Sequence, residues 1–424
     1  MFLSLVGIIV SFIVIIFFIR KQKSFGLSLI LGAVILGFFS LEFLSFQDIL
    51  KTIIAASIYS FDTGQINTET IELGLLSTFI FILAKTMQET GAITKLIESF
   101  RTVFSKGGIL GVIPAVYGLM PVPGGALLSA PMLDEEGNAY QLDNRQKNFL
   151  NIWFRHIWFP IFPISAAMIL ICSQKFSDID IGYLILINLP STLTAILIGY
   201  FMLRFFLKHK NPSVTKEDTG GLRGLIYLIP PIAPLFFYLI LQYVGFSQTR
   251  SFLIGVVFSI ALLFFLTHNT SGEYLKIIRR SCTWNLIIAI FGIMIFREMF
   301  EATKANSILV DLIQTTPTPP LVIIILIPFL LGLLTGYNLG AITLSYFLIQ
   351  PFFIFTSIPI LGLTSIIFIS SLVGYLISPI HLCNVLSSEY LKTNPMKIYR
   401  WFIPAAMTLL CIQIVFVVLV FSLG

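Results

Sequence analysis

The sequence predicts an all-α integral membrane protein, and three observations lead to this fold class. Of the 424 residues, 57% are hydrophobic and only 11% are charged, which is about half the charged fraction of an ordinary soluble domain. The apolar residues form long runs of Ile, Leu and Phe, and a membrane-spanning helix needs about 20 such residues. The runs do not alternate with polar residues, so they favour helices over a β-barrel.

The first apolar run, residues 2–19, predicts a transmembrane helix rather than a cleaved leader. No positively charged region precedes it and no small-residue cleavage site follows it, whereas Arg20, Lys21 and Lys23 come directly afterwards. Further runs along the chain predict spans for the same reason of length and composition. The predicted spans, about ten in all, cover residues 2–19, 25–41, 71–90, 148–172, 181–207, 222–243, 251–267, 281–299, 360–380 and 399–423.

Two further apolar segments are interrupted in the middle. Residues 107–133 contain Pro-Val-Pro-Gly-Gly at 121–125, and residues 319–357 contain Thr-Gly-Tyr-Asn-Leu-Gly at 335–340. Non-helical backbone at membrane depth persists only where it is buried in protein or lines a wet cavity. We therefore interpret both segments as re-entrant hairpins, each of which turns back to the side from which it entered.

The basic residues test this topology. If the N-terminus lies outside and both hairpins are re-entrant, 19 of the 26 Lys and Arg residues fall on the cytoplasmic side, as the positive-inside rule requires. If the hairpins crossed the membrane, the sidedness would reverse after each one and the bias would largely vanish. The topology places both chain termini outside. The cytoplasmic basic residues lie in 20–23, 95–106, 145–147, 204–223, 276–280 and 392–400.

The same topology divides the chain into two halves of opposite orientation. Residues 1–210 form a first repeat of five spans with the cytoplasm-facing hairpin 107–133. Residues 211–221 form a cytoplasmic linker. Residues 222–424 form a second repeat of five spans with the outside-facing hairpin 319–357. Inverted repeats of this kind are typical of secondary transporters.

Short sequence matches agree with an inverted repeat. "KTMQE" at 85–89 resembles "REMFE" further along, and "VIPAVYGLM" at 112–120 resembles "LIPFLLGLL". "GGA" at 124–126 corresponds to "LGA", and "IWFPI" at 157–161 to "LISPI". The four matches occur in the same order, at offsets of 212 to 219 residues.

The two hairpin tips are the first candidate binding elements. The helix that follows each tip points its N-terminus into the membrane, and that end carries unpaired N–H donors and partial positive charge suited to an anion. Asn338 and Thr335 add oxygens that could also hold Na⁺, with possible sodium positions near Gly125 and Asn338. The alternative is a pair of kinked helices that only pack. The candidate tip residues are Pro123, Gly124, Gly125, Thr335, Gly336, Asn338 and Gly340.

Two spans interrupted by proline supply the other candidates. Arg155 could pair with a substrate anion, because its guanidinium is a fork of donors, or it could extend to the cytoplasmic membrane surface. His156 and His381 could carry a coupled proton, bind substrate, or be structural hydrogen-bonding residues. A proline frees a backbone carbonyl in the preceding turn, which could coordinate a cation. Asn151, Ser378 and Asn384 lie in the same two segments.

Signs of catalysis are weak in the sequence. There is no nucleotide-binding G-x-x-x-x-G-K-[ST], no H-E-x-x-H and no G-x-S-x-G motif. The four cysteines are scattered without a C-x-x-C pair, which predicts small buried residues rather than disulfides or a zinc site. We expect no enzyme activity and no cofactor besides Na⁺ or H⁺ as the coupling ion. The topology accounts for the net charge of +6, so we expect no nucleic-acid partner.

Three stretches carry a family resemblance: "MPVPGGALLSAPML", "NRQKNFLNIWFRHIWFPIFP" and "SPIHLCNVLSSEYLKTNP". They resemble an uncharacterised family of prokaryotic membrane proteins, a domain of unknown function. That family resembles the ion-transporter superfamily of gluconate, citrate and dicarboxylate carriers. The resemblance implies a scaffold domain, a transport domain that moves like an elevator, a homodimer and the plasma membrane. In sodium–dicarboxylate relatives a Ser-Asn-Thr motif at the tips binds substrate and sodium, whereas this chain keeps only Asn338 near Thr335.

These observations together predict a secondary active transporter. It would move a small organic anion, a carboxylate, across the plasma membrane of a prokaryote by alternating access. Its expected partners are the anionic substrate, membrane lipids and a second copy of the chain. Two alternatives are a membrane subunit that depends on a binding protein, and an intramembrane enzyme that uses His156 and His381 as an acid–base pair.

Overall fold

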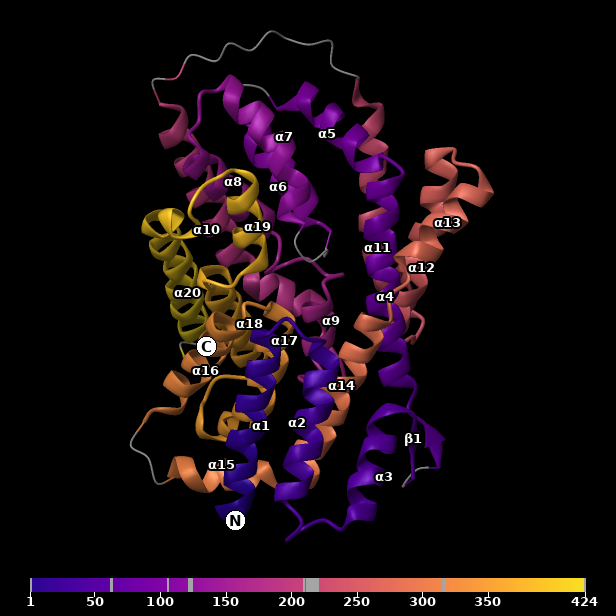
Figure 1. Ribbon diagram of the computed structural model, residues 1–424, viewed down its shortest axis with the longest axis vertical. Helices are drawn as coiled ribbons and strands as arrows, with labels where there is room; N and C mark the ends of the chain where they lie inside the picture. The colour runs from indigo at the N-terminus through magenta and orange to yellow at the C-terminus, as the bar shows by residue number, and fades with distance from the viewer. Residues whose placement is uncertain are drawn as a thin grey trace.

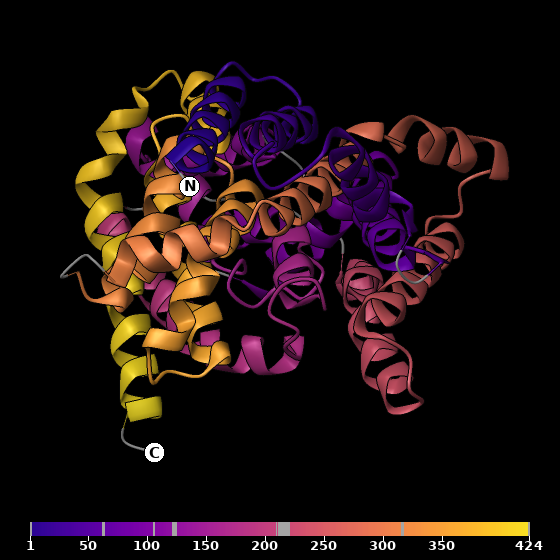
Figure 2. The same cartoon turned by 90° about the horizontal axis from the view of Figure 1, so that it is seen from below.

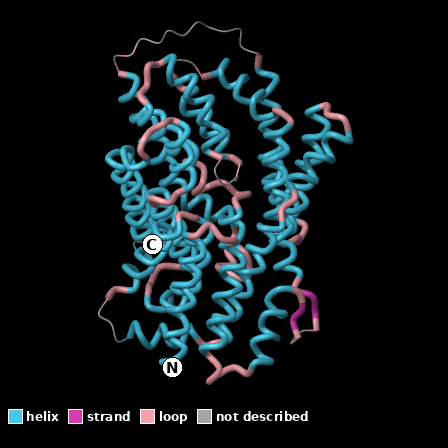
Figure 3. The backbone as a smooth tube through the Cα atoms, in the orientation of Figure 1, coloured by secondary structure: helices cyan, strands magenta, loops and turns pink. Residues whose placement is uncertain are grey.

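Almost every element of the protein is a helix, as the tube in Figure 3 shows. The computed structural model describes residues 2–61, 64–104, 107–120, 125–208, 210, 221–314 and 318–422. In these ranges the strands are confined to one short antiparallel ribbon, β1 (Tyr59–Ser60) with β2 (Gln65–Ile66). The predicted all-α class is confirmed. The tip residues Pro123 and Gly124 lie outside the described residues.

The first half of the chain runs from α1 to α10 (Figure 1). Its helices are α1 (Phe2–Arg20), α2 (Phe25–Phe39), α3 (Phe46–Ser57), α4 (Thr68–Glu89), α5 (Ala92–Val103), α6 (Ile109–Gly118), α7 (Ala126–Ala139), α8 (Asn144–His156), α9 (Ala166–Cys172) and α10 (Ile181–Leu207).

The second half runs from the short helix η1 to α20. Its helices are η1 (Leu222–Leu228), α11 (Ile229–Tyr243), α12 (Gln248–Thr267), α13 (Ser271–Ser281), α14 (Trp284–Ala302), α15 (Ala305–Gln314), α16 (Pro320–Thr335), α17 (Asn338–Ile349), η2 (Gln350–Phe355), α18 (Ile360–Ile377), α19 (Leu382–Tyr390), η3 (Pro395–Ile398) and α20 (Tyr399–Ser422).

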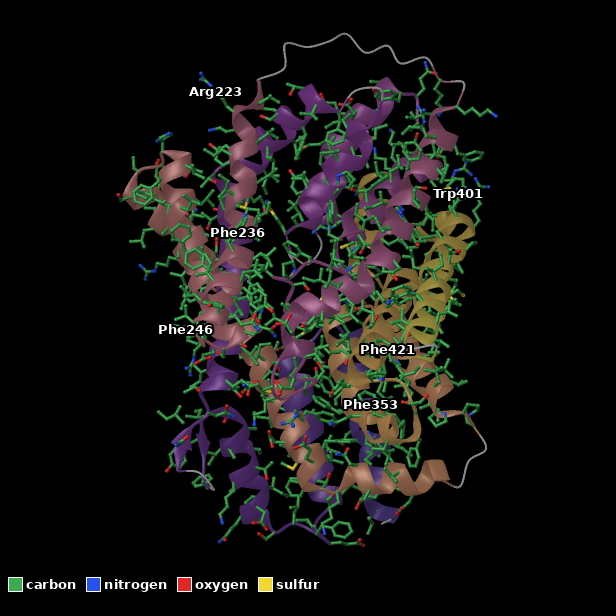
Figure 4. All side chains as sticks on the ribbon, turned by 180° about the vertical axis from the view of Figure 1, so that it is seen from behind. Arg223, Phe236, Phe246, Phe353, Trp401 and Phe421 are labelled. Carbon is green, nitrogen blue, oxygen red and sulfur yellow. The ribbon has the colours of Figure 1, made fainter. Side chains whose placement is uncertain are left out.

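The described part of the chain contains nine helices long and apolar enough to cross a membrane, so this is a multi-pass membrane protein. α2, α6 and α16 are apolar but shorter. The flanks fit a lipid surface, since Phe236 and Phe246 are exposed on one flank and the half-buried Trp401 lies on the opposite one (Figure 4). The predicted span 148–172 is not one continuous helix, because α8 ends at His156 and α9 begins only at Ala166.

Polar caps set where the interrupted helices begin. The Asp143 carboxylate accepts hydrogen bonds from the N–H groups of Arg145 and Gln146, and the Gln146 side chain accepts one from the Asp143 N–H. This capping box satisfies N–H groups that lack partners at the start of α8. The Ser165 hydroxyl accepts from Met168 N–H and so begins α9 after the irregular segment. The break between the two helices is therefore defined at both ends.

Several helix pairs of the first half have an equivalent pair in the second half, with helix numbers that differ by ten. α1 packs on α2 as α11 packs on α12, and α6 packs on α7 as α16 packs on α17. The same rule holds for contacts between the halves: α2 packs on α14 as α12 packs on α4, and α7 on α19 as α17 on α9. The pair α11 and α12 stands at one side of the molecule and α20 at the other (Figure 2).

Two helical hairpins lead into the interior. α6 and α7 descend from the upper end of the molecule, and α16 and α17 occupy its lower half (Figure 1). Gly125, just before α7, lies against Arg155 of α8, and Gly336, just after α16, lies against Ile380 beyond α18. Each hairpin therefore ends beside one of the two interrupted helices.

Candidate functional site

The two interrupted helices meet inside the protein. α8 ends at His156, and α18 ends at Ile377 shortly before α19 begins at Leu382. The His156 and His381 rings come from these two breaks, and their centroids are 4.9 Å apart. Tyr375 lies beside both rings, with its centroid 4.1 Å from that of His381. The structure thus brings together residues more than 200 positions apart. We call the place where His156, Tyr375 and His381 meet the crossing.

Hydrogen bonds orient the His156 imidazole. Nδ1 lies 2.6 Å from the Ile152 carbonyl oxygen, and Nε2 lies 3.2 Å from the Tyr375 hydroxyl. A carbonyl oxygen only accepts, so in the neutral ring Nδ1 carries the hydrogen. Nε2 then accepts from the Tyr375 O–H. The ring is 3% exposed, so these bonds hold it in the protein interior.

The His381 imidazole is fully buried beside it. Its Nδ1 lies 3.4 Å from the Leu376 carbonyl oxygen, which again assigns the hydrogen to Nδ1. Its Nε2 has no hydrogen-bond partner among the described residues. Cys383 lies two positions further along, also buried, and one ligand atom from each of His156, His381 and Cys383 lies within 4.8 Å of the others.

The guanidinium of Arg155 turns inward toward the first hairpin. Its Nη1 donates to the Tyr117 carbonyl oxygen at 2.8 Å and its Nη2 to the Met120 carbonyl oxygen at 3.2 Å. Tyr117 lies in the last turn of α6 and Met120 two residues beyond its end, where the partial charge of the helix terminus is negative. A Cβ added to Gly125 would collide with the guanidinium. Glycine at this position therefore lets Arg155 approach the hairpin.

Asn151 ties the start of α7 to α19. Its Nδ2 donates to the Ala126 carbonyl oxygen at 2.9 Å and to Ser387 Oγ at 2.8 Å, while its Oδ1 accepts from Ser129 Oγ at 2.6 Å. The side chain is fully buried. Asn151 therefore connects a helix of the first half to one of the second half.

Asn384 belongs to the same α8–α19 interface. Its Oδ1 accepts from Asn148 Nδ2 at 3.1 Å and from Ser388 Oγ at 3.3 Å. Asn148 Nδ2 also donates to Ser388 Oγ at 2.8 Å. These buried amides give the interface a continuous polar face next to the crossing.

The second hairpin turns at Gly336. This residue has φ of +59°, a left-handed conformation that glycine adopts without strain. Thr335 Oγ1 donates to the Leu331 carbonyl oxygen at 2.7 Å. Ser378 Oγ, from the break after α18, donates to the Leu333 carbonyl oxygen at 2.7 Å. Ser378 therefore satisfies the end of α16 much as Arg155 satisfies the end of α6.

α17 begins at Asn338, directly after this turn. Asn338 is buried, and its Oδ1 accepts from Ser371 Oγ at 3.3 Å. Gly340 packs closely against the rings of Phe25 and Tyr337. The start of α17 therefore points into the interior with an amide side chain beside it.

Polar residues of α10, α18 and α20 surround the break after α8. Asn188 Nδ2 donates to the Pro160 carbonyl oxygen at 2.9 Å. Ser365 Oγ donates to Asn188 Oδ1 at 2.7 Å, and Gln413 Nε2 donates to Ser365 Oγ at 2.7 Å. These buried bonds supply partners for backbone that the break leaves without helical ones.

Sequence reasoning missed several of these residues. Cys383 was interpreted only as a small buried residue, although its spacing of two from His381 was visible. Tyr375 follows His156 by the same 219 residues that separate Pro160 from Pro379, so the repeat offset could have pointed to it. Asn188 and Gln413 had no distinguishing pattern.

A separate cavity of about 490 Å³ opens between the start of α4, the loop after α9 and the α11–α12 turn. Arg250 Nε lies 2.7 Å from the Glu72 carboxylate in its wall. Burial raises the pKa of Asp180, but hydrogen bonds from Tyr238, Gln242 and backbone N–H groups outweigh it and leave the pKa below its usual value. Acidic side chains exceed basic ones in this wall: Glu69, Glu72, Asp178 and Asp180 face Arg250.

Comparison with known proteins places the chain in a family. None of the curated proteins compared with it matches. A family model described as "protein of unknown function" (DUF401) matches residues 2–419. Because this match covers nearly the whole sequence, the chain belongs to the DUF401 family of proteins of unknown function.

Proposed function

We propose that the protein is a secondary active transporter that carries a small organic anion through the membrane without changing it chemically. The observation that supports this most directly is the meeting of two hairpins and two interrupted helices at the crossing. Irregular backbone at membrane depth is expensive unless it is buried in protein or lines a wet cavity. Helices of this discontinuous kind form the substrate and ion sites of many secondary transporters.

The proposal includes an inverted repeat of residues 1–210 and 222–424 joined by the linker 211–221. Its support is the recurrence of helix contacts at a shift of ten elements, including the reciprocal pairs α2–α14 and α12–α4. Two similar halves of opposite orientation can exchange conformations, which gives access to alternate sides. In this proposal the hairpins and interrupted helices move as a transport domain against a scaffold, as an elevator does.

The chemistry near the crossing supports an anionic substrate, and we favour a carboxylate. The N-termini of α7 and α17 carry partial positive charge, and the first N–H groups of a helix have no partner within the helix itself. Asn338 adds an amide side chain, and Arg155 adds positive charge beside Gly125. The acidic wall of the 490 Å³ cavity favours a cation, which supports coupling to Na⁺ or H⁺.

The surroundings of the transporter are also part of the proposal. The basic residues favour an orientation with both termini outside the cytoplasm, in the plasma membrane of a prokaryote. We propose a homodimer, by analogy with the carriers that the sequence resembles.

Uptake into proteoliposomes tests the proposal. Purified full-length protein is reconstituted, and a panel of radiolabelled carboxylates is offered under an inward Na⁺ gradient, an inward proton gradient, or neither. We expect accumulation of one or a few carboxylates that is abolished when an ionophore removes the driving gradient. Absence of gradient-driven uptake for the whole panel would contradict the proposal.

An asparagine substitution tests the proposed site itself. Asn338→Ala removes the amide at the start of α17 while its one described hydrogen bond, from Ser371, is long at 3.3 Å. We expect uptake to fall at least about tenfold, the effect of losing roughly 1.4 kcal/mol of binding, with little loss of stability. The matched control is Asn306→Ala in α15. Equal uptake by the two variants would remove Asn338 from the site.

A further inference from the structure

We propose that His156, His381 and Cys383 bind a thiophilic metal ion of the Zn²⁺ or Cu⁺ type at the crossing. One ligand atom from each side chain lies within 4.8 Å of the other two, and all three side chains are buried. His156 comes from the end of α8, and the other two come from the start of α19. A metal at this point would join the two interrupted helices, and its binding does not depend on the proposed transport.

The two imidazoles are already oriented as metal ligands. Nδ1 of His156 faces the Ile152 carbonyl oxygen, and Nδ1 of His381 faces the Leu376 carbonyl oxygen. A metal-binding histidine commonly donates its other ring N–H to such a carbonyl, which fixes the tautomer. Both Nε2 atoms therefore carry the lone pair of the ring, which on His156 accepts from the Tyr375 hydroxyl and on His381 meets no partner among the described residues.

His381 Nε2 provides a second, independent observation. The atom is buried and has no hydrogen-bond partner among the described residues. A buried polar atom without a partner is destabilising, and native proteins contain few of them. A metal ion between the two imidazoles and the thiol would satisfy this atom.

The donor set selects the kind of ion. Two imidazole nitrogens with one sulfur suit Zn²⁺ and copper, whereas Ca²⁺ and Mg²⁺ require oxygen ligands. Cys383 would release its thiol proton to solvent, because the thiolate is the ligand. Three ligands are enough to complete the coordination of Cu⁺. The single positive charge of Cu⁺ is balanced by the negative charge of the Cys383 thiolate. Zn²⁺ would keep a fourth position open for water.

The distances require a modest contraction. With bonds of about 2.0–2.3 Å, neighbouring ligand atoms in a zinc site lie roughly 3.3–3.7 Å apart. The ligand atoms here lie within 4.8 Å of one another. His156 is the last residue of α8 and His381 immediately precedes α19, so both can shift without bending a continuous helix.

Tyr375 competes with the ion. Its hydroxyl donates to His156 Nε2 at 3.2 Å and so occupies the lone pair that the metal needs. Metal binding must turn this hydroxyl away. Tyr375→Phe removes the competitor, and we expect it to tighten metal binding several-fold. A cluster that is merely hydrogen-bonded would gain no metal affinity from this change.

The experiment uses full-length protein purified in detergent and freed of metal with a chelator. It is titrated with Zn²⁺, with Co²⁺ as a coloured substitute for Zn²⁺, and anaerobically with Cu⁺ in the presence of a competing Cu⁺ chelator. We expect about one ion per chain by elemental analysis. Bound Co²⁺ should give a near-ultraviolet thiolate charge-transfer band. The relative affinities for Zn²⁺ and Cu⁺ decide which ion the site prefers.

Cys383→Ser supplies the matched test, with Cys172→Ser as control, because Cys172 is also buried but lies outside the cluster. Cys383→Ser should abolish the charge-transfer band and weaken binding at least about 10–100-fold, while Cys172→Ser keeps both. Elution volume and thermal midpoint without metal verify folding, and Tyr375→Phe retains all three ligands.

Three results would overturn the proposal: no stoichiometric binding of any of the three ions by wild-type protein, equal binding by the two cysteine variants, or unchanged affinity in Tyr375→Phe. Because metal binding is measured in detergent without a gradient, its failure would leave the uptake result unaffected.

Discussion

The two hairpins reach the same region of the protein, but their first helices end in different ways. The last carbonyls of α6 accept hydrogen bonds from the guanidinium of Arg155, whereas Ser378 and the left-handed Gly336 complete the end of α16. In the proposed repeat, an offset of 219 makes Gly374 the counterpart of Arg155, and the missing Cβ of Gly374 lets α18 touch the Phe329 carbonyl. Under this proposal, the second half has a close backbone contact where the first half has the Arg155 side chain.

The second helices of the hairpins differ as well. α7 is tied through Asn151 to α19, with hydrogen bonds of 2.6 to 2.9 Å. α17 is tied at Asn338 by the 3.3 Å bond from Ser371. We infer that polar groups at the start of α17 are more available to bind a ligand. The polar groups at the start of α7 mainly hold α7 against α8 and α19.

Removal of the guanidinium should have the largest effect on stability. Arg155→Met removes two buried hydrogen bonds from a charged donor, and a hydrogen bond to a charged group contributes roughly 1.5–3 kcal/mol. We expect a loss of about 4 kcal/mol in unfolding free energy, measured by denaturant titration in mixed micelles. Arg223→Met, at an exposed position, is the control. A loss in Arg155→Met no larger than in this control would show that α6 ends stably without the cation.

A matched pair of glycines tests what the hairpins share. A Cβ on Gly118 would collide with the Arg155 carbonyl oxygen, and one on Gly332 with the Ser371 carbonyl oxygen. Gly118→Ala and Gly332→Ala should each cost about 3 kcal/mol, at the upper end for overpacking. Gly272→Ala, where nothing lies within 4 Å, should be neutral or slightly stabilising. If only one of the two interior variants is destabilised, the halves do not share this contact.

Two asparagines separate structural from ligand-binding roles. Asn151→Ala removes three hydrogen bonds from a buried position and should cost about 2 kcal/mol. Asn338→Ala should cost less than about 1 kcal/mol and yet reduce uptake more strongly per unit of folded protein. Thermal unfolding and uptake are measured on the same preparations. The reverse order of stabilities would contradict the division between the two hairpins.

A small effect is expected at Ser378. Ser378→Ala removes one hydrogen bond to the Leu333 carbonyl oxygen, and a neutral bond contributes about 1 kcal/mol. Ser307→Ala, at an exposed position of α15, is the control. If Ser378→Ala lost as much unfolding free energy as Arg155→Met, the hydroxyl and the guanidinium would stabilise their helix ends equally, which would contradict the difference between the two hairpins.

The helix interruptions at the two hairpins were predictable because glycines and prolines interrupt apolar segments. Local patterns also revealed the two broken spans, through Pro160 and Pro379. They could not reveal where Arg155 points, since its partners are backbone carbonyls on another helix. They could not reveal the Cys383 cluster either, because a buried cysteine has the same local pattern whether it packs or binds. That distinction depends on a contact between breaks more than 200 residues apart.

The reciprocal packing of α2 on α14 and of α4 on α12 has a consequence for biogenesis. α4 ends at Glu89 and α12 begins only at Gln248, so at about 5–20 residues per second the ribosome delivers the partner roughly ten to thirty seconds later. During that interval α4 lies in the membrane with the surface that α12 will cover facing lipid or an insertion factor. That surface therefore has to be compatible with the bilayer first and with the finished protein afterwards.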